Sequence, residues 1–200
     1  MFDVLIIGGG VAGVSCALVL GSAHKKVFAA NKKIAIIAHQ KTSSLQEALF
    51  NNAYGIAAGK LGSDLLLESV AQLQELYPHV LQIDNEKVMS IAGNHPNFMV
   101  TTNKNVYKTK DIVVTIGYSN TFSIDGLMQF VENHKKSVPE KNRIQLKNID
   151  HKVTNGIYVA GTLAGCRSQL SIAAGSGAAV ATDILTDWNS GIQSQSHDKR

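Results

Sequence analysis

The chain has 200 residues, 44% of them hydrophobic, and a formal net charge of +4 at pH 7. A chain of this length buries roughly 70% of its unfolded surface, so its core needs neither disulfides nor a structural metal. Two cysteines exclude a disulfide framework and predict a reducing, cytoplasmic location. Met1 leads directly into a strand-like run, which is not the pattern of a signal peptide, and no apolar stretch is long enough to predict a membrane span. The lysine clusters are small and not interleaved with aromatic residues, so no nucleic-acid partner is expected.

The first third of the chain predicts a strand–helix–strand unit followed by a second helix. Residues 4–7 (VLII) and 34–38 (IAIIA) are continuous apolar runs, which is typical of parallel strands buried on both faces. A helix is expected between them, over residues 11–20. Leucines at helical spacing predict the next helix over residues 63–77.

The rest of the chain predicts mainly short strands and one long helix. Residues 118–142 have the weakest pattern, with one short amphipathic helix expected over 127–133, and the polar residues 189–200 predict a flexible tail. The long alanine-rich helix is expected over 168–185. Strands are expected over 80–83, 87–91, 98–102, 106–108, 111–116 and 157–160, with a hairpin turn at 103–105.

The segment GGGVAG after the first strand fits the pattern G-x-G-x-x-G with Gly8, Gly10 and Gly13. The first glycine permits a sharp turn, the second leaves room for a pyrophosphate, and the third lets the helix pack on the sheet. The helix that begins at Val11 and Ala12 offers free N–H groups and a partial positive charge to phosphates. The motif predicts a dinucleotide cofactor and leaves open FAD, NAD, or a tight turn with no ligand.

The acidic residue that usually ends the second strand and holds a ribose is missing, because its place falls at Ala38 or His39. His39 or Gln40 is expected to bind a ribose hydroxyl instead. The lost charged hydrogen bond, ~1.5–3 kcal/mol, predicts roughly ten- to hundredfold weaker binding. The missing acid favours no particular nucleotide.

Two C-terminal segments carry a family resemblance. NGIYVAG at 155–161 and GCRSQLSIAAGSGAAVA at 165–181 resemble the second flavin-binding signature of the thioredoxin reductase-like, FAD-dependent pyridine nucleotide-disulfide oxidoreductases. GKLGSDLLL, KVMSI and YKTKDIVVTIG precede them in the family's order, so the resemblance covers nearly the whole chain. It implies an α/β, Rossmann-like FAD-binding fold with a central parallel sheet, flanking helices and a small antiparallel β-meander.

The resemblance implies FAD as the cofactor and gives roles to matching positions. The backbone around Val88 would meet the adenine, and Gly161 and Thr162 would lie beside the ribitol and pyrophosphate. Gln169 and Leu170 would place N–H groups near the pyrimidine edge of the flavin, where a helix N-terminus stabilises the charge of the reduced ring. The complete set of cofactor-binding residues expected at this stage is Gly8, Gly10, Val11, Ala12, Gly13, His39, Gln40, Val88, Thr115, Gly117, Gly161, Thr162, Gln169 and Leu170.

The chain also departs from the family pattern. Members usually carry an aspartate at the position of Thr162 and insert an NAD(P)H-binding domain after the strand matching 111–116. Here residues 118–142 are too few for a domain of about 100 residues, and the C-x-x-C of that inserted domain is absent. We therefore expect one FAD-binding domain over 1–188, with 118–142 as a short linker.

These features predict an FAD-binding oxidoreductase-type flavoprotein that passes electrons through bound flavin from an external donor. The alternatives are a flavin-binding or electron-transfer module without turnover, and an NAD-binding regulatory domain, which rests only on the first glycine motif. The electron donor and acceptor are not specified, and the resemblance implies a homodimer.

No side chain stands out as catalytic. Cys166, beside Arg167 and just before the last helix, is a candidate for a reactive thiolate, with a plain structural thiol as the alternative. Cys16 lies among small apolar residues and is expected in the core. The seven histidines have no metal-ligand spacing, so no metal site is expected.

Overall fold

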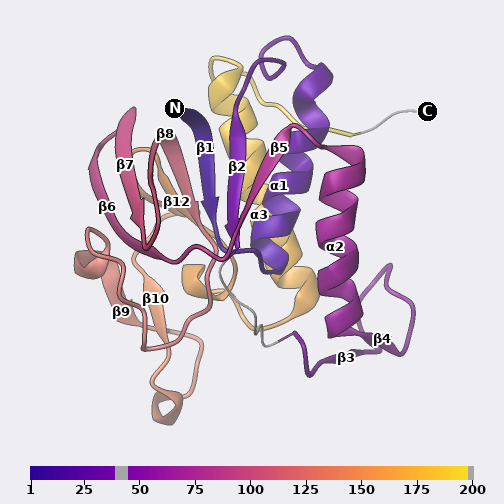
Figure 1. Ribbon diagram of the computed structural model, residues 1–200. Coiled ribbons are helices and arrows are strands. Elements are labelled where there is room, and N and C mark those ends of the chain that lie inside the picture. The colour runs from indigo at the N-terminus through magenta and orange to yellow at the C-terminus, as the bar shows by residue number, and fades with distance from the viewer. Residues whose placement is uncertain (39–44, 198–200) are drawn as a thin grey trace.

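The continuous apolar runs of the sequence become the centre of one sheet in the computed structural model, which describes residues 1–38 and 45–197. The strands of its main path lie in the order β11-β12-β8-β1-β2-β5. All neighbours on this path pair in parallel except β11 and β12 (Figure 1). The strands are β1 (Phe2–Ile7), β2 (Ile34–Ala38), β5 (Val80–Asp84), β8 (Val106–Val114), β11 (Lys152–Thr154) and β12 (Ile157–Val159).

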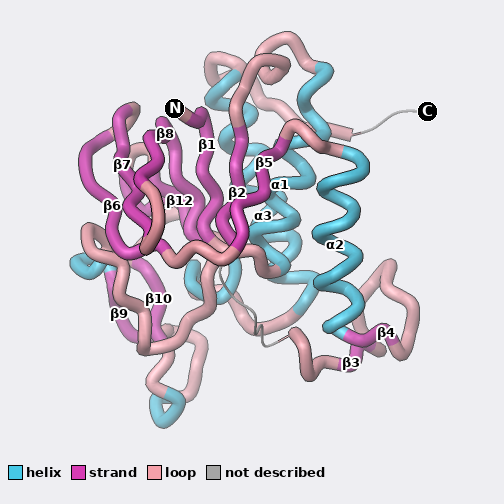
Figure 2. The backbone as a smooth tube through the Cα atoms, in the orientation of Figure 1, coloured by secondary structure: helices cyan, strands magenta, loops and turns pink. Residues whose placement is uncertain are grey.

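The sheet is covered differently on its two faces. Helices α1 (Val11–Ser22), α2 (Gly62–Leu76) and α3 (Leu170–Trp188) gather on one face, as Figure 2 shows. Strands β6 (Val88–Asn94) and β7 (Asn97–Thr102) continue from β8 as an antiparallel meander on the other side. Successive side chains of β1 alternate between two apolar clusters, because strand side chains point to opposite faces in turn.

Helices α1 and α3 pack closely because small residues face each other. A Cβ on Gly177 would lie 2.0 Å from the carbonyl oxygen of Ala12. The Ser15 hydroxyl donates a hydrogen bond to the carbonyl oxygen of Ala174, 2.7 Å away. The start of α1 therefore packs against the first half of α3.

Short elements complete the fold. A pair of two-residue strands, β3 (Leu49–Phe50) and β4 (Lys60–Leu61), precedes α2. Strands β9 (Val131–Asn133) and β10 (Ile144–Leu146) form a second small sheet, which projects below the main sheet in Figure 1. We call residues 128–147 the small lobe. The 3₁₀ helices are η1 (Ala23–Lys25), η2 (Met128–Phe130), η3 (Pro139–Lys141) and η4 (Gly161–Ala164).

The structure confirms the expected fold class, including the parallel sheet, the flanking helices and the β-meander. The expected helix over 127–133 is wrong, since η2 occupies only its first part and Val131–Asn133 pairs with β10. Residues 106–108 and 111–116 do not form two strands. A single strand, β8, runs from Val106 to Val114, because β7 and β1 supply hydrogen-bonding partners on its two sides.

The structure describes the C-terminal segment only as far as residue 197. Ser194 is buried, and its backbone N–H donates to the Thr186 hydroxyl at 3.0 Å, while residues 198–200 lie outside the described residues. The flexible tail and the single domain over 1–188 therefore stay predictions. Within the described residues, no helix is both long and apolar enough to cross a membrane.

Candidate functional site

The glycine turn between β1 and α1 has three positions with different surroundings. Gly8 has a φ of +118°, and a Cβ there would lie 2.9 Å from the Thr115 hydroxyl oxygen. A Cβ on Gly13 would lie only 1.9 Å from the carbonyl oxygen of Gly8, whereas a Cβ on Gly10 would meet nothing within 4 Å. Gly8 and Gly13 are thus required by the fold, and Gly10 keeps the space in front of the turn open.

Thr115 fixes this turn from the neighbouring strand. Its backbone N–H donates to the Ile7 carbonyl oxygen at 2.8 Å. Its buried hydroxyl lies 3.0 Å from the same oxygen and 2.8 Å from the Gly8 carbonyl oxygen. Since the hydroxyl is occupied by the backbone, Thr115 shapes the glycine turn rather than presenting a donor to a ligand.

Two helix N-termini open at this edge of the sheet. The N-cap residues are Gly10 for α1 and Gln169 for α3, and neither helix has a side-chain capping hydrogen bond. The first N–H groups of each helix therefore lack the usual side-chain acceptor, and their partial positive charge favours an anion.

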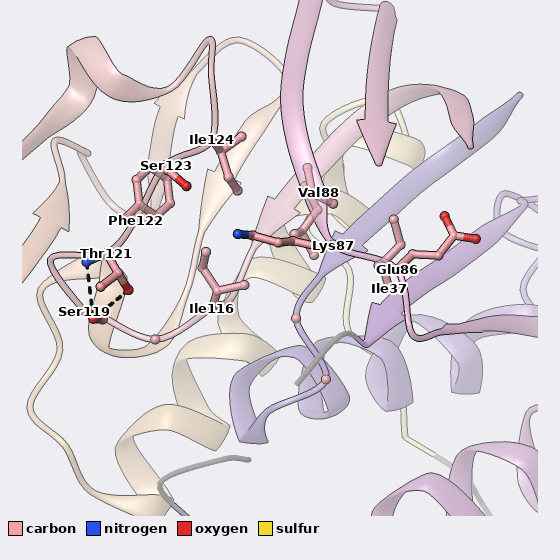
Figure 3. Close-up of a pocket in the computed structure, with 14 residues that line it drawn as sticks. Ile37, Glu86, Lys87, Val88, Ile116, Ser119, Thr121, Phe122, Ser123 and Ile124 are labelled. Carbon is pink, nitrogen blue, oxygen red and sulfur yellow. Dashed lines mark hydrogen bonds between the residues drawn. The ribbon is translucent and has the colours of Figure 1, made fainter. Parts of the chain in front are cut away.

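A first cavity, about 250 Å3 in volume, lies at the carboxyl ends of β1, β2 and β8. Figure 3 shows the Lys87 ammonium group pointing into it, while the Glu86 carboxylate turns away. Its lining residues are Ile7, Gly8, Gly9, Ile37, Glu86, Lys87, Val88, Ile116, Gly117, Ser119, Thr121, Phe122, Ser123 and Ile124.

The carboxylate of Glu86 is held by other groups. It accepts hydrogen bonds from the Thr102 hydroxyl at 2.6 Å, the Asn105 amide at 2.7 Å and the Tyr107 hydroxyl at 2.9 Å. These bonds, the one from Thr102 above all, hold the pKa of Glu86 below its usual range. An ionised carboxylate so occupied replaces the missing ribose acid poorly, because three of its roughly four acceptor positions are already used.

A second cavity, about 230 Å3 in volume, lies between α1, α2 and the start of α3. Most of its lining is apolar, and the glycine turn separates it from the first cavity: Gly8 and Gly9 line the first, and Gly10 and Val11 the second. Its lining residues are Gly10, Val11, Val14, Ser15, Leu18, Leu45, Ala53, Tyr54, Ile56, Leu65, Leu66, Ser69, Leu170, Ser171 and Ala174.

The expected site residues fall into three groups. Gly8, Val88 and Gly117 line the first cavity. Gly10, Val11 and Leu170 line the second. The remaining described ones, which line neither cavity, are Ala12, Gly13 and Thr115 behind the turn, Gly161 and Thr162 on η4, and the exposed Gln169.

Gly161 connects η4 to the helix layer. Its N–H donates to the buried Ser176 hydroxyl at 2.8 Å, and a Cβ on it would lie 3.1 Å from that of Ala12. His39 and Gln40 lie outside the described residues. Cofactor binding by these residues stays a prediction.

Sequence reasoning missed the polar wall of the first cavity, which comes from Lys87, Ser119, Thr121 and Ser123. One signal was present: the last three follow Gly117 at the end of a parallel strand, and ligands of open α/β sheets bind outside those ends. Lys87 directly precedes the expected adenine-binding position.

The cysteines do not form a redox pair. Cys16 is completely buried in α1, and burial raises the pKa of its thiol far above the usual range. Cys166 is half-buried between η4 and α3, and both thiols are free. Within residues 1–38 and 45–197, no cluster of three His, Cys, Asp or Glu side chains could hold a metal.

A glycine turn between a parallel strand and a helix N-terminus, flanked by two cavities, is the arrangement found in dinucleotide-binding α/β folds. The pyridine nucleotide-disulphide oxidoreductase family matches residues 2–173, and the chain belongs to that family. Its members are generally flavoproteins. No curated protein sequence matches the chain.

Solved structures with the same fold include thioredoxin reductases. One from Gloeobacter violaceus has a TM-score of 0.72 and 15% identity, covering 100% of this chain and 98% of that chain. An oxidoreductase from Agrobacterium tumefaciens has a TM-score of 0.70 and 13% identity, covering 93% and 98%. A ferredoxin-flavin thioredoxin reductase from Clostridium acetobutylicum has a TM-score of 0.68 and 17% identity, covering 94% and 98%. At these identities the likeness establishes the fold.

Proposed function

We propose that the protein binds FAD and passes electrons through it, taking them from an external donor. The observation that supports this most is the open space at Gly10 between two cavities. A long dinucleotide fits such an arrangement, with its adenosine part in the first cavity, its pyrophosphate at the glycine turn and its flavin in the second cavity. The apolar lining of the second cavity suits a flat aromatic ring.

The chain's own groups would bind and orient the cofactor. The start of α1 supplies N–H donors and positive potential to the pyrophosphate. Gln169 and Leu170 at the start of α3 supply the same to the pyrimidine edge of the flavin, which favours the negative charge of its reduced form. Bound FAD supplies the two-electron chemistry, and no side chain is assigned an acid, base or nucleophile role.

The donor is proposed to be external because the chain between β8 and β10 is too short for a nicotinamide-binding domain. Free NAD(P)H, a separate reductase and a reduced substrate are the candidate donors. The absence of a C-x-x-C from the sequence favours a second candidate function, a flavin-binding electron-transfer module without turnover. A steady-state assay with NADH or NADPH and a generic electron acceptor separates the enzyme from the module. In an enzyme the bound flavin is reduced and reoxidised repeatedly, whereas a module without turnover shows no sustained reduction of the acceptor.

A substitution at Gly10 tests the cofactor assignment. Gly10→Val adds a side chain where the protein has open space, so we expect an unchanged circular dichroism spectrum and a loss of FAD affinity of at least about tenfold, or 1.4 kcal/mol. Gly175→Ala is the matched control, because a Cβ there also meets nothing within 4 Å but lies on an exposed part of α3. Isothermal titration calorimetry with FAD, FMN and NAD measures the affinities.

Two outcomes oppose this proposal. A folded but colourless native protein that gives no heat with FAD contradicts flavin binding. If the nucleotide released by heating is NAD, the chain is instead an NAD-binding domain.

A further inference from the structure

The positive charge of the protein is concentrated on the small lobe. These 20 residues carry a net charge of +3, while the other 180 residues together carry +1. The charged residues of the lobe are Lys135, Lys136, Lys141, Arg143 and Lys147, opposed by Glu132 and Glu140.

Most of these cations remain available at the surface. Lys135 pairs with Glu132 at 2.8 Å. Lys136, Lys141 and Lys147 are exposed, and none of them has an ion-pair partner within the part of the chain that the structure describes. The internal pairing therefore uses up one of the two carboxylates and leaves an excess of solvated positive charge.

The lobe is built to hold its shape despite its short strands. The buried Gln145 side chain accepts a hydrogen bond from the Lys135 N–H at 3.0 Å and donates one to Glu132 at 2.8 Å. The centre of the Tyr118 ring lies 4.7 Å from the guanidinium carbon of Arg143 and 5.4 Å from the centre of the His134 ring. The lysines thus project from an ordered platform.

This platform adjoins the first cavity, because Tyr118, whose ring packs on Arg143, lies between the lining residues Gly117 and Ser119. It also adjoins η4: directly after the lobe, the Asn148 side-chain amide donates to the carbonyl oxygen of Ala164 at 3.2 Å. A Cβ on Gly165, at the end of η4, would lie 2.7 Å from the Gln145 side-chain oxygen. In Figure 1 the lobe lies at the same end of the sheet as the starts of α1 and α3.

We propose that the small lobe docks a small acidic electron-carrier protein. This inference rests on the proposed function, since a redox cofactor beside the lobe with no nicotinamide domain requires a donor from outside the chain. Transient electron-transfer partners form small interfaces, and complementary charge steers their encounter, which suits a compact positive lobe. Nucleic acid fits less well, because Phe130 is half-buried and Tyr118 already packs on Arg143, so neither is free to stack on bases.

A charge reversal with a matched control tests the docking surface. The double variant Lys136→Glu/Lys141→Glu is compared with Lys25→Glu/Lys26→Glu, which makes the same change in net charge around η1, beyond the far end of α1. The probe is an acidic [2Fe–2S] ferredoxin in its oxidised form, titrated by calorimetry into the full chain at low ionic strength. We expect the lobe variant to lose about tenfold in affinity, the control less than about twofold, and added salt to weaken native binding.

Oxidised carrier is used so that binding is measured independently of flavin turnover, and FAD uptake is measured in parallel on every variant. A native chain that takes up FAD but does not bind the carrier overturns the docking proposal while leaving the proposed function intact. Equal losses in the two variants overturn it as well. Tighter binding of duplex DNA or anionic lipid vesicles than of the carrier, lost in the lobe variant alone, assigns the lobe to that partner instead.

Discussion

The β1–α1 unit and the small lobe are stabilised in different ways. In β1, Val4 to Ile7 are all buried, and the strand is paired in parallel on both sides. In the small lobe each strand has only three residues and one strand neighbour, and side-chain hydrogen bonds through Gln145 tie the pieces together. The first region depends on apolar packing and close backbone contact. The second also packs on the apolar core, through the fully buried Leu146 and the half-buried Phe130, Val131 and Ile144, but its parts are joined by a few polar groups.

This difference bears on function. The packed region fixes the glycine turn, and a ligand there meets a backbone whose position is determined by neighbouring strands. The lobe carries charge at the surface, where exact packing matters less than exposure. Three substitutions test the comparison, in order of expected effect.

The largest effect is expected from Gly13→Ala. Its Cβ would lie 1.9 Å from the Gly8 carbonyl oxygen and 2.6 Å from the Thr115 hydroxyl oxygen, so the helix must move off the sheet. We expect the free energy of unfolding to fall by about 3 kcal/mol. Urea denaturation measures it, with Gly175→Ala as a control expected to raise stability by about 0.5–1 kcal/mol. A loss below about 1 kcal/mol would show that the turn tolerates backbone movement.

A smaller and local effect is expected from Gln145→Leu. This change leaves the Lys135 N–H and the Glu132 carboxylate without the buried amide, at a cost of about 2 kcal/mol. Amide hydrogen exchange should accelerate in β9 and β10 while the protection of β1 and β8 stays unchanged. Gln129→Leu, an exposed position in the same lobe, serves as the control. Faster exchange in the central strands would contradict the separation of the two regions.

The smallest effect concerns the one strongly shifted carboxyl on the central strands. Burial raises the pKa of Asp111 to about 6, opposed in part by His95 at 3.5 Å. Because this pKa lies above the unfolded value of about 3.9, the folded state binds the proton more tightly, and stability falls as pH rises from about 4 to about 6.

Asp111→Asn removes this ionisation. We expect it to raise the free energy of unfolding at pH 8 by about 1 kcal/mol, a figure reduced for partial solvent screening, and to change it little at pH 4. Urea denaturation at pH 4, 6 and 8 checks the slope. A variant that is destabilised most at pH 8 would show that Asp111 is stabilised by its ionised form.

The same contrast explains what the sequence could predict. The runs VLII and IAIIA are apolar at every position, which is typical of strands in a sheet covered on both faces. The glycine spacing directly indicates the turn between β1 and α1. Residues 127–133 are ambiguous by comparison, because a seven-residue apolar pattern suits one helical turn as well as a short strand. Val131–Asn133 forms a strand because it pairs with Ile144–Leu146, a contact between segments that no local sequence pattern encodes.

Prediction of the site divides along similar lines. Gly8 and Gly10 could be placed near a cavity because motif positions correspond to backbone geometry, and Val88 because the family resemblance implied its place. Lys87 and Ser119 could not, since their roles depend on how the chain after Gly117 folds back toward β6. In the segment after Gly117, the Asp125 N–H donates to the carbonyl oxygen of Met89 on β6 at 3.0 Å, so this folding depends on a contact between segments far apart in the sequence.

The two cavities have no lining residue in common. If each receives one half of the cofactor, the halves can be tested as separate fragments, such as ADP and FMN, each with a modest affinity of its own. Joining them converts the second contact into an intramolecular step at high effective concentration. The affinity for intact FAD would then come from the covalent link between its two halves as much as from the contacts in either cavity.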